Sequence, residues 1–121
     1  MTRIIGIGVD ILHLPRLVSL TSRHTSGSFL APCHSFLFLF YARWAIKEAA
    51  YKAVYPVMKP TWKEFTFLRI HDDVANLKPV LEYRPLKVDR GEPVDNTVMK
   101  MHASVSHDGE YIFATVLAER V

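Results

Sequence analysis

The sequence contains one cysteine, Cys33, among its 121 residues. A single thiol excludes an internal disulfide and any metal cluster built from several cysteines, and it suits a reducing compartment. Long hydrophobic runs are also missing, because the apolar run from Phe36 to Tyr41 is far shorter than the roughly 20 residues that span a bilayer. The opening residues carry no secretory signal. These absences predict a soluble protein with no membrane span.

The motifs of several enzyme classes are absent as well. The stretch from Ile4 to Asp10 has two glycines but not the third glycine of a dinucleotide-binding fingerprint, and no Walker-type phosphate loop is present. The histidines lack the spacing of zinc ligands. No serine or cysteine lies in a recognisable nucleophile motif. Dinucleotide-dependent, P-loop and zinc enzymes are therefore poor explanations of this chain.

The balance of charge is only mildly basic, with a net charge of +3 and a sequence pI near 9.1. It fits an anionic ligand or an acidic partner, although a soluble surface with some extra Lys and Arg explains it equally well. No dense Lys/Arg run and no base-stacking motif is present, so nucleic acid is not an expected partner. Half of the residues are hydrophobic, which predicts one globular domain over residues 1–121. Its core would be modest, so oligomerisation would add stability.

The first half of the chain predicts a strand and two helices. Residues 3–12 are short, apolar and β-branched, as in a buried strand. A proline suits the first turn of a predicted helix over residues 15–23. Residues 24–41 show no clear pattern and form an atypical connecting segment. Over residues 42–54, alanines and aliphatic side chains recur at helical spacing, which predicts an amphipathic helix that begins near Ala42.

The second half changes to a period of two, which is typical of strands. The predicted strands cover residues 64–71, 79–84, 98–106 and 111–119. The last two are joined through Asp108-Gly109, a strong hairpin signal, and Gly91-Glu92-Pro93 marks a further turn. The predicted fold class is α+β, with a strand, two helices and then a mostly antiparallel sheet.

A few polar side chains are candidates for chemistry. Asp10 follows the two glycines at the end of the first predicted strand, where an aspartate either serves function or forms a turn or cap. Glu48 and Lys52 lie four residues apart on the polar side of the predicted helix. They form either a solvated ion pair or a Mg²⁺-binding carboxylate with a lysine one turn away. His107 is either an exposed turn histidine or a pocket residue, and His102 is expected to pack or to lie on the sheet surface.

Three blocks, in order, resemble the holo-acyl-carrier-protein synthase type of 4′-phosphopantetheinyl transferase. They are Gly6–Ile11, Arg43–Ala53 and Val105–Tyr111. The Gly91-Glu92-Pro93 turn is similar to the family's Gly-x-Pro before the third block. The second block is fairly specific, and the ordered set is a strong signal.

The resemblance implies a site for coenzyme A and Mg²⁺. By position, the metal ligands are Asp10 and Glu48, and Lys52 approaches the coenzyme A phosphates; these three are the expected catalytic residues. The resemblance also implies that four further residues bind coenzyme A, namely Arg43, His107, Gly91 and Pro93. Of these, Arg43 lies at the nucleotide end. Two arginines on the helix after the first block are implied to bind the acidic carrier protein, namely Arg16 and Arg23.

The implied reaction moves the 4′-phosphopantetheine arm of coenzyme A to a serine of an acyl carrier protein of fatty-acid or polyketide synthesis, and it releases 3′,5′-ADP. Such phosphoryl transfer depends mostly on positioning and charge neutralisation. A metal-bound water or a carboxylate takes the serine proton. The resemblance further implies a homo-oligomer, commonly a trimer with active sites between subunits. The expected location is cytoplasmic, or mitochondrial if the chain is from a eukaryote.

Two alternatives stay open because the resemblance covers residues 3–23 and 42–119 and leaves 24–41 outside. In the family the connection there is longer, helical and charged, whereas here 38 positions (48 − 10) separate the two predicted metal ligands. The chain is then either an active transferase or a catalytically defective relative that binds coenzyme A or carrier protein without turnover. A different Mg²⁺-dependent enzyme that acts on a nucleotide diphosphate is the third hypothesis.

Overall fold

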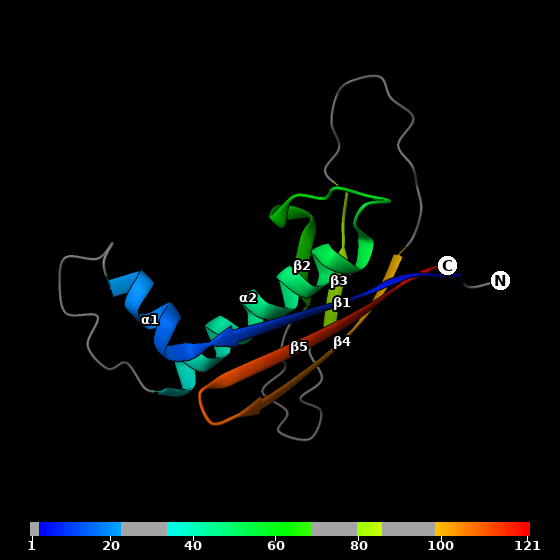
Figure 1. Cartoon of the computed structure of the whole chain (residues 1–121). Coiled ribbons are helices and arrows are strands. Elements are labelled where there is room, and N and C mark those ends of the chain that lie inside the picture. Colours follow the sequence, from blue (N-terminus) through cyan, green and yellow to red (C-terminus); the bar gives the residue numbers. More distant parts are fainter. Residues whose placement is uncertain (1–2, 23–33, 69–79, 86–98) are drawn as a thin grey trace.

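The computed structural model describes residues 3–22, 34–68, 80–85 and 99–121 (Figure 1). Its elements in chain order are β1 (Arg3–His13), α1 (Leu14–Ser22), α2 (His34–Val54), the 3₁₀-helix η1 (Trp62–Glu64), β2 (Phe65–Leu68), β3 (Val80–Tyr83), β4 (Met99–Asp108) and β5 (Tyr111–Arg120). A strand and two helices followed by further strands confirm the predicted α+β class. No helix in these ranges combines the length and the hydrophobicity that a membrane crossing requires.

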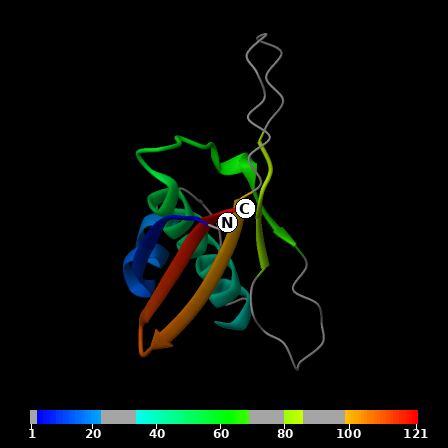
Figure 2. The same ribbon diagram turned by 90° about the vertical axis from the view of Figure 1, so that its right-hand side faces the viewer.

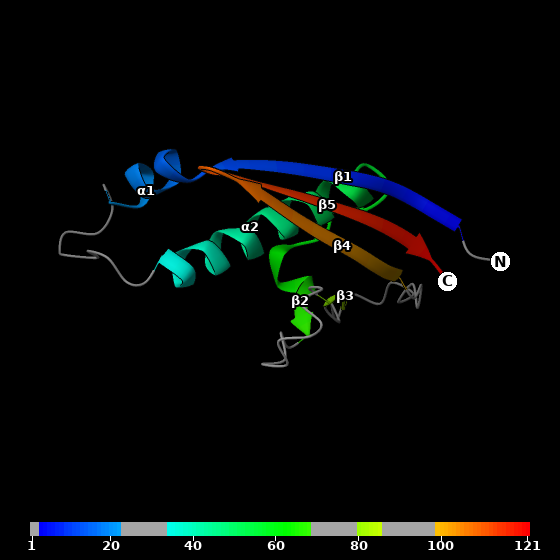
Figure 3. The same cartoon turned by 90° about the horizontal axis from the view of Figure 1, so that it is seen from below.

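The strands form one antiparallel sheet in the order β1-β5-β4-β3-β2. The first and last strands of the chain are therefore neighbours, and the two termini lie at the same end of the sheet (Figure 3). β4 and β5 form the predicted hairpin, in which Gly109 has a φ of +54°. Glycine adopts this left-handed conformation without a steric penalty, which explains the Asp-Gly pair at the turn.

Helix α2 packs along one face of the sheet (Figure 2). Its predicted alanine stripe is buried, with Ala45, Ala49 and Ala50 fully inaccessible to solvent. The stripe meets buried side chains of β5, among them Ile112 and Val116. Small helix residues against a β-branched sheet allow a close contact between the two layers, so this interface forms the core.

The opposite face of the sheet carries apolar side chains that remain exposed. We call this set the outer sheet face; it comprises Ile7, Val9 and Ile11 of β1 with Tyr111 and Phe113 of β5. Directly paired residues, such as Ile11 and Phe113, point to the same side of an antiparallel sheet. An apolar patch of this kind marks an interaction surface in most soluble proteins.

The start of α2 differs from the sequence prediction. The helix was expected near Ala42, but it begins at His34, eight residues earlier (42 − 34). From Phe36 to Tyr41 the added turns form an apolar run without alternating polar positions, so they show no amphipathic period that would reveal a helix. Within them, Tyr41 is buried in the core and Phe38 packs against it. The other half of the predicted connecting segment lies outside the described residues.

Candidate functional site

Two glycines on β1 allow α2 to lie very close to this strand. Gly6, Gly8 and Asp10 alternate along β1, so they share the side that faces α2. A Cβ on Gly8 would meet the carbonyl oxygen of Ala49 and would lie 2.6 Å from the backbone nitrogen of Ala53. A Cβ on Gly6 would meet the carbonyl oxygen of Ala53. The Gly-x-Gly stretch thus has a packing role, and it brings Asp10 next to the helix.

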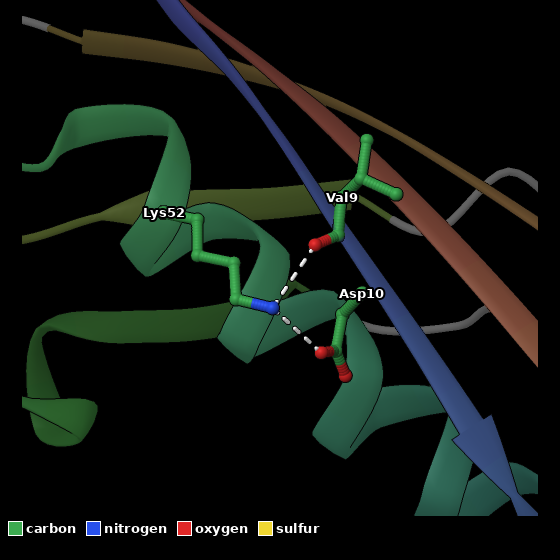
Figure 4. Close-up of polar contacts among 3 residues, drawn as sticks. All are labelled: Val9, Asp10 and Lys52. Carbon is green, nitrogen blue, oxygen red and sulfur yellow. Dashed lines mark hydrogen bonds and ion pairs between the residues drawn. The ribbon is translucent and has the colours of Figure 1, made fainter.

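Across this contact, Asp10 and Lys52 form an ion pair (Figure 4). Nζ of Lys52 lies 2.9 Å from Oδ1 of Asp10 and donates a second hydrogen bond, of 3.1 Å, to the carbonyl oxygen of Val9. The Asp10 side chain is 13% exposed, whereas that of Lys52 is 51% exposed. Asp10 also lies within β1, which continues to His13, so the turn or cap alternative is wrong.

The second carboxylate oxygen of Asp10, Oδ2, is buried and has no hydrogen-bond partner among the described residues. A buried acceptor without a donor is costly, and most such atoms in proteins contact a ligand, an ion or water. Oδ2 is therefore the atom of this site that is best suited to an additional ligand.

Glu48 lies one helical turn before Lys52 and is half-buried. In the described part of the chain, no ion pair joins Glu48 to Lys52, whose ammonium binds Asp10. The solvated Glu48–Lys52 pair is therefore not formed. The side chains of Asp10 and Glu48 are of the type that binds Mg²⁺, which takes one or two carboxylates along with waters and substrate phosphates. Over the described ranges no cluster of three or more His, Cys, Asp or Glu side chains is arranged to hold a metal.

His107 lies near the end of β4, on the side of the sheet that faces α2. Its partner in β5 is Ile112, which is fully buried on that side. The ring of Phe38, in the first part of α2, meets the imidazole edge-on, with centroids 4.8 Å apart and an interplanar angle of 74°. Sequence reasoning missed Phe38, because the apolar run around it showed no periodicity.

Arg43 lies on the other flank of α2. Its guanidinium carbon is 5.7 Å from the ring centroid of Phe67 in β2, whereas Lys52 contacts β1 at the opposite edge of the sheet. Within one chain, α2 therefore separates Arg43 from Asp10 and Lys52. The structure does not bring these predicted site residues together in a single protomer.

The remaining predicted positions are less informative. Arg16 is exposed on α1, as a residue that contacts a partner must be. His102 lies on the sheet surface, as expected, where its ring is 2.9 Å from the carboxylate of Glu119. Three predicted positions lie outside the described residues, namely Arg23, Gly91 and Pro93.

A comparison with models of protein families identifies the chain. The model described as the 4′-phosphopantetheinyl transferase superfamily matches residues 6–115, which include the strand, the helix and the hairpin that carry the predicted site. The chain belongs to this superfamily. The resemblance seen in the three sequence blocks is therefore confirmed, and so is the expectation of an enzyme of this transferase family.

Named relatives of this phosphopantetheinyl transferase support the same family assignment. The holo-[acyl-carrier-protein] synthase of Mycoplasmoides gallisepticum is 28% identical over 130 residues, which cover 98% of this chain and 99% of that protein. The mitochondrial holo-[acyl-carrier-protein] synthase of Candida glabrata is 26% identical over 141 residues, with 92% and 91% covered. A solved holo-(acyl-carrier-protein) synthase from Bacillus anthracis, in complex with CoA (3′,5′-ADP), has a TM-score of 0.62 and 26% identity, and 98% of each chain is covered.

The superfamily match spans residues 6–115, a range that contains residues 24–41. Within the described part of the chain, residues 34–41 continue the helix that carries Glu48 and Lys52.

Proposed function

We propose that this transferase moves the 4′-phosphopantetheine group of coenzyme A to a serine of an acyl carrier protein, and that it uses Mg²⁺. The superfamily, the named relatives and the geometry around Asp10 support this proposal. The observation that carries it is the Asp10 carboxylate, which binds the Lys52 ammonium through one oxygen and leaves the other, a buried oxygen, without a partner among the described residues. The proposed location is cytoplasmic, or mitochondrial if the chain is from a eukaryote, as in the relative named as a mitochondrial synthase.

Asp10 and Glu48 are the residues that would hold Mg²⁺. When bound, the ion neutralises negative charge on the diphosphate of coenzyme A. Lys52 fixes the orientation of Asp10 and keeps a positive charge at the solvent side of the site. Two donors of its ammonium are used by Asp10 and Val9, so the remaining N–H is available to a phosphate oxygen. The side chains thus place positive charge where the diphosphate would lie.

The transfer itself is a displacement at phosphorus. The serine oxygen of the carrier protein bonds to the phosphorus that bears the pantetheine arm. The bond from this phosphorus to the oxygen that bridges the two phosphates breaks, and 3′,5′-ADP leaves with that oxygen. The serine proton passes to water or to a carboxylate of the site. Such a reaction needs positioning and charge stabilisation more than covalent catalysis, which is what Asp10, Glu48 and Lys52 supply.

The carrier protein would approach along α1. This helix follows directly on β1, the strand that carries Asp10, and Arg16 is exposed on it. We assign Arg16 and Arg23 to electrostatic contacts with the acidic carrier, and such contacts affect the association rate more than the chemical step. Substitution of Arg16 should therefore raise KM for the carrier protein and leave KM for coenzyme A unchanged.

We further propose a homo-oligomer, a trimer by family resemblance, with active sites between protomers. Arg43 and Lys52 are nine residues apart on α2 (52 − 43), about 13 Å along the helix axis, and they face opposite flanks. Arg43 would then complete the site of a neighbouring protomer together with His107, Gly91 and Pro93. The exposed outer sheet face supplies an apolar surface for the assembly.

The decisive test is a transfer assay read by intact mass. Purified protein, Mg²⁺, coenzyme A and an apo carrier protein should yield the holo carrier, with the mass of the added arm. Omission of Mg²⁺ should stop the reaction, and a known synthase run in parallel controls for the carrier. Binding of coenzyme A without any mass gain would instead support the catalytically defective relative.

Glu48→Gln tests the metal ligand directly. The amide keeps the size of the side chain but removes the negative charge that Mg²⁺ requires. We expect transfer to be abolished while the thermal unfolding midpoint stays close to that of the parent protein, because the side chain is only half-buried. Full activity of this variant would exclude Glu48 as a ligand.

A further inference from the structure

Helix α1 lacks the features that usually stabilise the start of a helix. It has nine residues, fewer than the roughly 12–15 that an isolated helix needs in water. Its first turn contains no acidic side chain, and the residue before it, His13, is not one of the side chains that usually cap a helix. The helix therefore depends on contacts with other elements to hold its first turn.

The turn of the β4–β5 hairpin supplies such contacts. It lies beside the start of α1, because His13 at the end of β1 pairs with Tyr111 at the start of β5 (Figure 3). The carbonyl oxygen of Glu110 accepts a 2.8 Å hydrogen bond from the backbone N–H of Leu14. This N–H is one of those at a helix start that have no acceptor within the helix. The hairpin turn thus satisfies the first backbone donor of α1.

Two side-chain contacts add to this backbone bond. Nε2 of His13 lies 3.2 Å from Oε2 of Glu110, at hydrogen-bond distance. The rings of His13 and Tyr111 have centroids 4.9 Å apart and an interplanar angle of 35°. Glu110 also brings a negative charge beside the N-terminal end of α1, where the helix dipole favours it and the first turn of α1 supplies none. We call His13, Glu110 and Tyr111 the α1 anchor.

The α1 anchor lies between two residues of the proposed site. Asp10 is three positions before His13 (13 − 10) and Arg16 is three positions after it (16 − 13). Pairing with Ala114 of β5 holds the backbone of Asp10 in the sheet, whereas Arg16 moves with α1. The direction in which α1 leaves β1 therefore sets where Arg16 lies relative to Asp10.

We infer that the α1 anchor is a positioning element, which holds α1 in the orientation that the carrier protein binds. The inference rests on the proposed function, because it concerns the helix to which carrier binding is assigned. A partner that binds one orientation of α1 binds more weakly when only a fraction of the protein has that orientation. A saturating partner restores it, so the anchor affects KM for the carrier and leaves kcat unchanged.

Glu110→Ala tests this role in the full-length protein. We expect KM for an apo acyl carrier protein in the mass-based transfer assay to rise about two- to fivefold, the scale of an exposed ion pair and a helix-dipole contact. KM for coenzyme A and kcat should stay at the parent values. Amide hydrogen exchange of Leu14–Ser22 should become faster, with no change in α2. The exchange measurement does not depend on activity.

Matched variants separate positioning from general damage. Glu110→Gln keeps an acceptor for His13 and should give an intermediate KM for the carrier. The His13→Ala and Glu110→Ala changes combined should raise this KM by less than the product of their single effects, because they remove the same pair. Glu82→Ala breaks the 2.7 Å ion pair with Arg84 in the distant strand β3 and should change neither KM nor exchange. Each variant should keep the parent's sedimentation, because Tyr111 stays in place.

Three results for Glu110→Ala would overturn the inference. They are unchanged exchange in α1, faster exchange with an unchanged KM for the carrier, and an equal rise in KM for coenzyme A. Any of them, with a parent protein that transfers the arm, removes only the present inference. A parent protein without transfer removes the proposed function, and calorimetric titration with the apo carrier then decides the inference. Weaker carrier binding by Glu110→Ala supports it, and equal or absent binding overturns it.

Discussion

At the scale of single residues, Lys52 controls the orientation of the Asp10 carboxylate. Replacement by methionine keeps the length and most of the apolar stem but removes the charge and both hydrogen bonds. We expect Lys52→Met to lower the transfer rate by about 100-fold or more, as for the loss of a charge-stabilising donor. The unfolding midpoint should change by only a few degrees, because a half-exposed ion pair contributes little stability. Single-turnover mass kinetics and thermal unfolding measure the two effects separately.

Lys59→Met is the matched control for this experiment. Lys59 is exposed beyond the end of α2, so its loss should leave the transfer rate intact. Lys52→Arg should retain part of the rate, since the guanidinium keeps the charge but not the geometry of the ammonium. A Lys52→Met enzyme as fast as the parent would show that Asp10 needs no such partner.

Gly8 has no side chain because α2 occupies the space where a Cβ would lie. In Gly8→Ala the new methyl group would meet the backbone of Ala49 and Ala53, so the helix must move away from β1. We expect a loss of stability of about 1–3 kcal/mol, the usual cost of overpacking. Chemical denaturation measures it, and Ser104→Ala, at an exposed position of β4, should cost far less. Because the shift separates Lys52 from Asp10, activity should fall even under conditions in which the variant is fully folded.

The sequence blocks identified Asp10, Glu48 and Lys52 as candidate site residues, but they did not show how the fold arranges these side chains. Asp10 and Lys52 are 42 positions apart, so no local spacing reveals their ion pair. The contact depends on the glycines of β1, whose packing role appears only when strand and helix are brought together. For the same reason, the sequence did not reveal that Arg43 lies on the flank of α2 opposite Lys52 within the protomer.

At the scale of elements, the early start of α2 places Phe38 beside His107. Phe38→Leu keeps an apolar side chain but removes the ring that meets the imidazole. If His107 belongs to the coenzyme pocket, KM for coenzyme A should rise about two- to tenfold, which corresponds to one aromatic pair, with kcat little changed. The proton resonances of His107 should also lose the ring-current shift that Phe38 causes. A normal KM together with a lost shift would place His107 outside the pocket.

Some helices and strands could be predicted from the local sequence, whereas parts of others could not. The hairpin was predicted, because Asp-Gly at the turn and alternating apolar residues on both sides are local signals. The strand predicted over residues 64–71 is seen over Phe65–Leu68, and residues 69–71 lie outside the described ranges. The first turns of α2 were missed, because the apolar run from Phe36 to Tyr41 has no helical period that the sequence alone can show.

At the scale of the whole molecule, the outer sheet face is the surface proposed for self-association. Ile7 is exposed on this face, and Ile7→Glu would bury a charge in any interface formed there. We expect the variant to sediment as a monomer and to lose transfer activity while keeping its secondary structure. Val57→Glu makes the same change at an exposed apolar residue beyond α2 and should leave the oligomer intact.

Mixing two inactive variants would show whether each site draws residues from two protomers. In a trimer assembled from equal amounts of Glu48→Gln and Arg43→Ala chains, some sites combine the intact Glu48 of one protomer with the intact Arg43 of the next. If the sites lie between protomers, about a quarter of them should be complete and transfer should return to that fraction of the parent rate. If each protomer holds its own site, every site lacks one residue and the mixture stays inactive. Co-refolded mixtures, compared with each variant alone in the mass assay, distinguish the two arrangements.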